Sequence, residues 1–303
     1  MTLVIVVAMV ILLDVAALLF GHDSRARGTG RPARDERRGT MGDQPLIVWS
    51  LVAIGVLGIP ATATWALHRG AVDAGMSRGS SWLIAGAAGY LFVAWIVASG
   101  ILAGTGVYGG GAGGVAPWFG IAVAGALVAF LAATRIPAVS RILDQPQSLS
   151  RLAWANAFRV VGVSFLIAMA LGDLPWVFAV PAGVGDIAAG IAAPFVARKL
   201  ARGEGHRDAR RFHWYGIGDL VVALTIGFFA GLGPWLLIDV TPTTEALALL
   251  PLALVPTTAV PLTITLHVAS LQRLHQAKPF EPALRDERLG AAEQRSRDER
   301  SLV

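Results

Sequence analysis

The sequence predicts an all-α fold, a polytopic bundle of membrane-spanning helices. Of its 303 residues 55% are hydrophobic and 15% are charged, and the mean hydropathy is +0.62, values well outside those of soluble proteins. The apolar residues gather in stretches of about 20, the length that a helix needs to cross roughly 30 Å of hydrocarbon. Of the nine tryptophans, which favour the boundary between lipid and water, only Trp95 lies well inside such a stretch.

Eight stretches meet this length requirement. The first, residues 3–20, is followed by an arginine-rich linker, and together they form an N-terminal segment, residues 1–40. A seven-helix bundle is expected within residues 41–275, with spans at 46–67, 81–103, 117–135, 153–171, 175–197, 213–237 and 246–269. The remaining segment, 276–303, holds six acids and six bases and reads as a charged cytoplasmic tail. Its balanced charge predicts no nucleic-acid binding.

The distribution of Lys and Arg predicts the direction of the bundle, because cytoplasmic loops carry the excess of these residues. The connections 68–80, 136–152 and 198–212 contain them, whereas 104–116, 172–174 and 238–245 contain none. The seven helices are therefore expected to begin with the N-terminus outside and to end with the C-terminus in the cytoplasm.

Residues 21–45 are an exception to this alternation. It places the segment outside, where few Lys or Arg residues are expected, yet the segment contains several arginines. Two interpretations remain open: the first helix is an additional span, or the natural chain starts at Met41. The stretch "LLDVAALLFGHDSR" resembles the single span of short bacterial membrane proteins.

Two acidic residues lie within the apolar stretches, Asp186 in "PAGVGDIAAG" and Asp219 in "YGIGDLVVAL". An ionisable residue near a helix centre costs about 2.5–3.5 kcal/mol on insertion scales, so it needs a partner or water. Arg159 and Asp219 each follow a boundary tryptophan by five residues, so both lie about 7.5 Å deep, and we expect an ion pair between them. Asp186 lies near mid-membrane with no basic residue at its own depth.

The candidates for binding a proton or a cation are therefore Asp186, Asp219, Arg159 and the polar neighbour His267. His68, His213 and His267 are expected near cytoplasmic helix ends as interfacial side chains, and a haem or metal site is the less favoured alternative. No metal, cofactor or catalytic residue is assigned. Because the chain has no cysteine, thiolate chemistry is excluded.

Glycines flank both aspartates and permit close approach of membrane helices. We expect the helices at 175–197 and 213–237 to touch near their acids, through Gly183, Gly185, Gly190, Gly216 and Gly218.

Two segments of the second half, 158–197 and 251–274, resemble uncharacterised bacterial multi-pass integral membrane proteins. This resemblance implies the bacterial cytoplasmic (inner) membrane as the location and brings no activity with it. The "GIGD" at Asp219 also resembles the second motif of the Gly-x-Gly-Asp intramembrane aspartyl proteases, and this resemblance implies Asp186 as the first aspartate. Gly185 stands where that family has Tyr, and "PLAL" at 251–254 replaces Pro-Ala-Leu.

Three functions follow as hypotheses. The first is a small proton- or cation-linked carrier in which Asp186 binds and releases the ion. The second is a non-catalytic accessory or sensor protein whose partners are other membrane proteins, and the third is an intramembrane aspartyl protease. An enzyme is the less expected class. The lipid bilayer is the predicted surrounding in each case, and the substrate is not predicted.

Overall fold

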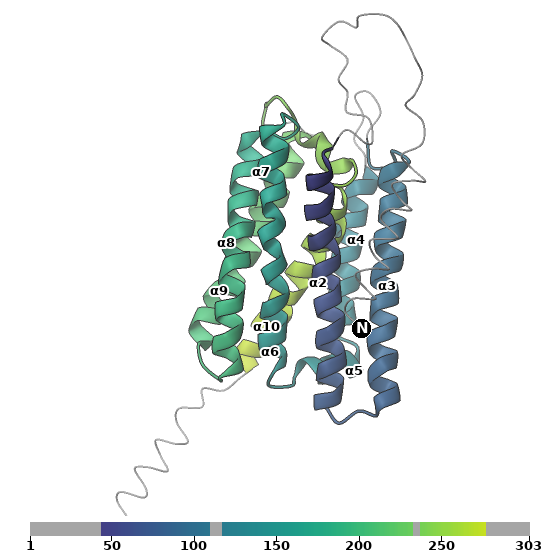
Figure 1. The fold of residues 1–303 in the computed structure, drawn as a ribbon, viewed down its shortest axis with the longest axis vertical. Coiled ribbons are helices and arrows are strands. Elements are labelled where there is room, and N and C mark those ends of the chain that lie inside the picture. The colour runs from purple at the N-terminus through teal and green to yellow at the C-terminus, as the bar shows by residue number, and fades with distance from the viewer. Residues whose placement is uncertain (1–43, 110–116, 233–236, 277–303) are drawn as a thin grey trace, which may run out of the picture.

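The protein is a bundle of helices in the computed structural model, which describes residues 44–109, 117–232 and 237–276 (Figure 1). No strand occurs in these ranges, which confirms the all-α prediction. The predicted helix at 3–20, the arginine-rich linker and the charged tail from residue 277 lie outside the described residues.

The α-helices of the described ranges overlap the predicted spans, except for one short helix in the expected connection 136–152. They are α2 (Leu46–Asp73), α3 (Arg78–Gly104), α4 (Pro117–Ala133), α5 (Pro137–Leu143), α6 (Ser148–Ala155), α7 (Val163–Ala170), α8 (Trp176–Ala201), α9 (His206–Gly227) and α10 (Val260–Gln276). Short 3₁₀ segments occur at η1 (Asn156–Gly162) and η3 (Thr244–Ala248), and π-helical turns occur at η2 (Phe228–Leu232) and η4 (Val255–Ala259).

Five helical segments of the described chain are long and apolar enough to cross a membrane. They are α2, α3, the continuous run Ser148–Ala170, α8, and α9 with its π-helical turn. A sixth is obtained if α4 and α5, which meet at a bend of 78°, count as one span. The last expected span, 246–269, is instead a broken segment of η3, η4 and the 17-residue α10.

The broken C-terminal segment forms the interior of the bundle. Helix α10 contacts α9, α4, α6 and α2, and most of its residues are buried although several of them are polar: Thr263, Thr265, His267 and Ser270. The outer helices expose large apolar side chains such as Leu83, Leu91 and Val128. This distribution is expected in a bilayer, where lipid solvates apolar surface and polar groups find partners between helices.

Candidate functional site

Arg159 is the centre of a buried charge cluster. Its Nε donates a hydrogen bond to Asp186 Oδ1 at 2.7 Å, and its Nη2 donates to Asp219 Oδ2 at 2.5 Å. The side chain of Arg159 is 3% exposed, and those of Asp186 and Asp219 are 14% and 10% exposed. One guanidinium thus joins η1, α8 and α9, because its planar fork presents donors in several fixed directions.

Two histidines extend the cluster toward α10. Arg159 Nη1 lies 3.3 Å from His267 Nε2, and His267 Nδ1 lies 2.8 Å from His213 Nδ1. A guanidinium can only donate, so His267 Nε2 accepts and carries no proton. Neutral His267 therefore has its proton on Nδ1 and donates it to His213 Nδ1. His213 in turn carries its proton on Nε2, and that buried nitrogen has no hydrogen-bond partner among the described residues.

The 3₁₀ geometry of η1 explains how Arg159 faces inward. In a 3₁₀ helix, residues three positions apart eclipse one another along the axis. Asn156, Arg159 and Gly162 are spaced in this way, and they are the buried residues of η1. The side chains of Asn156 and Arg159 therefore lie on one face of η1 together with Gly162, which has no side chain, and this face is turned toward α8.

Three glycines make room for the members of the cluster. A Cβ on Gly162 would overlap Asp186, one on Gly185 would overlap the Asp219 carboxylate, and one on Gly216 would overlap the His267 imidazole. Each glycine lies on a helix next to the one whose side chain it accommodates. Close backbone approach of this kind is the usual role of glycine between membrane helices.

The other glycines that were expected to pack between helices have different surroundings. Gly183 lies against Leu166 and Gly162, and Gly190 lies against the backbone of Val160, so α8 packs closely on η1 and α7. Gly218 is exposed, and a Cβ added to it would meet no atom within 4 Å. The expectation for Gly218 was wrong, because it lies two residues from Gly216 and therefore on a different side of α9.

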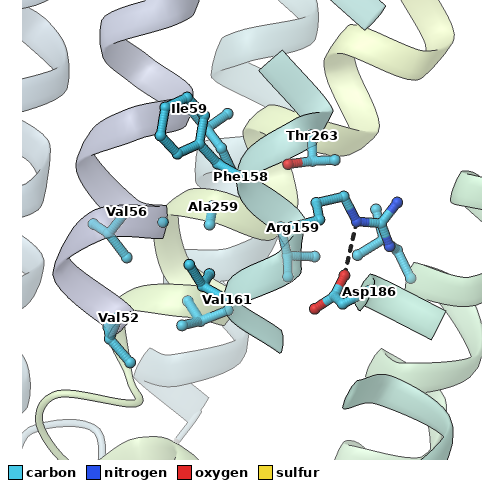
Figure 2. A pocket seen from close by; sticks show the side chains of 13 residues that line it. Val52, Val56, Ile59, Phe158, Arg159, Val161, Asp186, Ala259 and Thr263 are labelled. Carbon is cyan, nitrogen blue, oxygen red and sulfur yellow. Dashed lines mark hydrogen bonds and ion pairs between the residues drawn. The ribbon is translucent and has the colours of Figure 1, made fainter. Parts of the chain in front are cut away.

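A small cavity borders the cluster between α2, η1 and α10. Its volume is about 30 Å³, enough for roughly one water molecule. Figure 2 shows Val52, Val56, Ile59 and Phe158 around it, with Arg159, Asp186 and Thr263 as the polar groups. The cavity therefore places an apolar wall opposite the ion pair.

The expectation that Asp186 has no basic partner was wrong, whereas the expected Arg159–Asp219 ion pair is present. Counting residues from the boundary tryptophans placed Asp186 deeper than Asp219, whereas Gly185, the neighbour of Asp186, lies directly against the Asp219 carboxylate, so one guanidinium reaches both acids. The interfacial placement of His213 and His267 was also wrong, since both are fully buried. No group of three His, Asp or Glu side chains in the described ranges could hold a metal ion.

A second buried polar group joins α3 to η4. Ser99 Oγ lies 2.7 Å from Thr257 Oγ1 and 3.1 Å from the Tyr108 hydroxyl, and Trp95 Nε1 donates to the Thr257 carbonyl at 2.9 Å. Trp95 is the one tryptophan that lies well inside a predicted span, and this position was the signal in the sequence for a buried partner. Its indole N–H bonds a carbonyl within the π-helical turn.

Comparison with known proteins gives a family and no activity. Residues 116–275 match the model of a family described as "Domain of unknown function (DUF8737)", and this region contains both of the segments that resemble bacterial membrane proteins. It also contains every member of the charge cluster. No curated protein and no solved structure matches the chain.

Proposed function

The chain belongs to the DUF8737 family, and since that description names no activity, we propose from the charge cluster that the protein is a small proton-linked carrier. We further propose the full architecture of seven spans, with the N-terminus of the bundle outside and the C-terminus in the cytoplasm of a bacterium. The buried triad of Arg159, Asp186 and Asp219 is the single observation that carries the functional proposal.

The charges of the triad favour a proton over a metal cation. One guanidinium and two carboxylates sum to −1 when all are ionised, and a net charge is costly to bury away from water. One added proton makes the triad neutral. A metal cation would meet Arg159, which is bonded to both carboxylates, and would need several further oxygen ligands.

Gain or loss of a proton also changes the helix contacts. When one carboxylate is protonated, its attraction to Arg159 weakens, and the guanidinium is held by the other carboxylate alone. Since Asp186 lies on α8 and Asp219 on α9, the protonation state decides how firmly each helix is tied to η1. This dependence gives the carrier two arrangements that proton binding can bias.

The proposal is tested in proteoliposomes that contain the full chain and a pH-sensitive dye in the lumen. With the external solution acidic, mixtures of amino acids, organic acids, sugars and cations are added in turn. We expect at least one mixture to accelerate acidification of the lumen, and Asp186→Asn to abolish this acceleration. Asp208→Asn is the matched control, because Asp208 lies on α9 in an exposed pair with Lys199. If no mixture gives acidification that depends on Asp186, the carrier proposal is wrong.

A non-catalytic accessory or sensor role is the second candidate, and the size of the cavity favours it. A space for about one water holds no organic solute in this arrangement. In that case Asp186→Asn should alter co-purification of a membrane partner and leave the flux of every mixture unchanged.

The protease hypothesis gains no support from the geometry. Two catalytic aspartates would share one proton, whereas Arg159 donates to both Asp186 and Asp219. The protease hypothesis would be supported if a transition-state aspartyl inhibitor labels the wild-type protein and Asp219→Ala abolishes this labelling.

A further inference from the structure

We propose that His213 and His267 form a two-histidine proton path, which connects the Arg159 cluster with the end of the bundle where α6 and α9 begin and α10 ends (Figure 1). The inference rests on the proposed proton-linked function and adds the route and the side from which the proton is exchanged.

The hydrogen bonds of the two rings all point in one direction. Arg159 donates to His267 Nε2, His267 Nδ1 donates to His213 Nδ1, and His213 Nε2–H has no acceptor among the described residues. If the Arg159 guanidinium moves together with the ionised carboxylate, it no longer donates to His267 Nε2. His267 Nε2 can then accept the proton of the other carboxylate, which is the protonated one. His267 then passes its Nδ1 proton to His213 Nδ1, and His213 releases its Nε2 proton. One proton enters the pair and one leaves it.

The reverse step uses the same atoms. After release, His213 has a free lone pair on Nε2 and a proton on Nδ1, while His267 has its proton on Nε2. The pair then takes up a proton at His213 Nε2 and delivers one from His267 Nε2. Each passage reverses the tautomers of both rings, which are the two forms of neutral imidazole.

Unpaired polar atoms mark where the path continues beyond His213. Buried Asn156 Oδ1 and Ser270 Oγ have no hydrogen-bond partner in the described part of the chain, and neither has His213 Nε2. Asn156 precedes Arg159 by three residues and Ser270 follows His267 by three, so both lie about one turn from the cluster toward the same end. Buried polar atoms of this kind normally bond to protein or to ordered water.

Phe212 packs against both histidine rings. The residue is 6% exposed, and the centre of its ring lies edge-on at 5.1 Å from that of His213 and at 5.6 Å from that of His267. Together with Ala153 and Leu274 it belongs to an apolar cluster contributed by α6, α8, α9 and α10.

Besides the histidines themselves, the titratable groups that face the cluster in the described ranges are few. They are Arg159 from η1, Asp186 from α8, and Asp219 and Tyr215 from α9, with the Tyr215 hydroxyl 3.4 Å from the Gly185 carbonyl. None of them is hydrogen-bonded to His213 Nε2, which has no partner in the described ranges, so the exchanging proton leaves the histidine pair to water.

The first test uses the full chain with ¹⁵N-labelled histidine in lipid bilayers and nuclear magnetic resonance. We expect His267 to be protonated on Nδ1 and His213 on Nε2, with the His213 Nε2 proton exchanging with water faster than the His267 Nδ1 proton. Protonation of His267 on Nε2 in the resting protein, or a His213 proton that does not exchange with water, would overturn the path. This test needs no transported solute and no variant that has to fold.

The second test measures the charge displaced by a pH jump on reconstituted full-length protein attached to a solid-supported membrane. We expect His213→Asn to slow the current by about 100-fold, the lower end of the effect of a positioned proton-transfer group, and to keep its amplitude. His206→Asn, an exposed position on the same helix, is the control and should leave the rate unchanged.

The measurements distinguish failure of the histidine path from failure of the proposed carrier function. Equal rates for His213→Asn and the wild type would overturn the histidine path while Asp186→Asn still removes the current. A wild-type protein without any current would overturn the proposed function, and the resonance experiment would then decide whether the path itself exists.

Discussion

Gly185 on α8 and Asp219 on α9 lie so close that a Cβ on the glycine would overlap the carboxylate of the aspartate. The two Gly-x-Gly-Asp segments therefore meet in space: the glycine of one makes room for the acid of the other. This contact brings Asp219 within reach of the same guanidinium that binds Asp186.

The close approach of Gly185 predicts that Gly185→Ala destabilises the protein. The added methyl group must displace the Asp219 carboxylate or separate the helices, and overpacking of this kind costs about 1–3 kcal/mol. Gly218→Ala serves as the control, because nothing lies within 4 Å of its Cβ position. Thermal unfolding in detergent should show a lower midpoint for the first variant only, and equal midpoints would contradict the packing described.

Arg159→Met is expected to be more damaging, because it leaves two buried carboxylates without their cation. Breaking a buried ion pair costs about 3–5 kcal/mol. Arg159→Lys should recover only part of this loss, since an ammonium lacks the planar fork. Denaturant titration of the solubilised protein measures the effect. The triple variant Arg159→Met, Asp186→Asn, Asp219→Asn should be more stable than Arg159→Met alone, and if it is not, charge is not the cause.

Phe212→Ala is predicted to speed proton exchange at His213. The ring packs on both imidazoles and is itself almost fully buried, so we expect its removal to admit water. Exchange of the His213 Nε2 proton, followed by nuclear magnetic resonance, should accelerate by about tenfold or more, as expected when about 1.4 kcal/mol of the opening cost is removed. Leu83→Ala, at an exposed position of α3, should leave the exchange rate unchanged, and an equal effect of both would exclude a local role for Phe212.

Thr257→Val tests the second polar group. The change removes the hydroxyl that bonds Ser99 at 2.7 Å and the Ala253 carbonyl at 2.7 Å, while Ser99 keeps its contact with the Tyr108 hydroxyl, so we expect the cost of one lost buried hydrogen bond, about 0.5–1.5 kcal/mol. Thr105→Val is the comparison, since the exposed Thr105 hydroxyl bonds only carbonyls of its own helix. The free energy of unfolding should fall for Thr257→Val and change little for Thr105→Val.

Much of the fold could be predicted because each span is a local property of the chain. A run of about 20 apolar residues must satisfy its backbone internally, and in lipid a helix does so. The prediction of a continuous span was wrong for the segment that is surrounded by other helices. The segment 246–269 is enclosed by other helices, so it tolerates the prolines, the π-helical turn and the threonines that make it a broken element.

The candidate site was predicted in part for a similar reason. Equal depth below the boundary tryptophans paired Arg159 with Asp219 because depth is a one-dimensional quantity that the sequence contains. The pairing of Asp186 with Arg159 and the burial of His213 against His267 depend on lateral distances between helices. Those distances are set by which glycines face which side chains.

The sequence by itself determined that the chain is helical, with several segments long and apolar enough to cross a membrane, that its acids lie within apolar helices, and that glycines beside them allow close approach. Only the tertiary structure decided which groups meet: one guanidinium between two aspartates, and two histidines in a directed hydrogen-bond chain. The physical reason is that burial in lipid is a property of each segment, whereas a charge network requires four segments at distances of a few ångströms from one another.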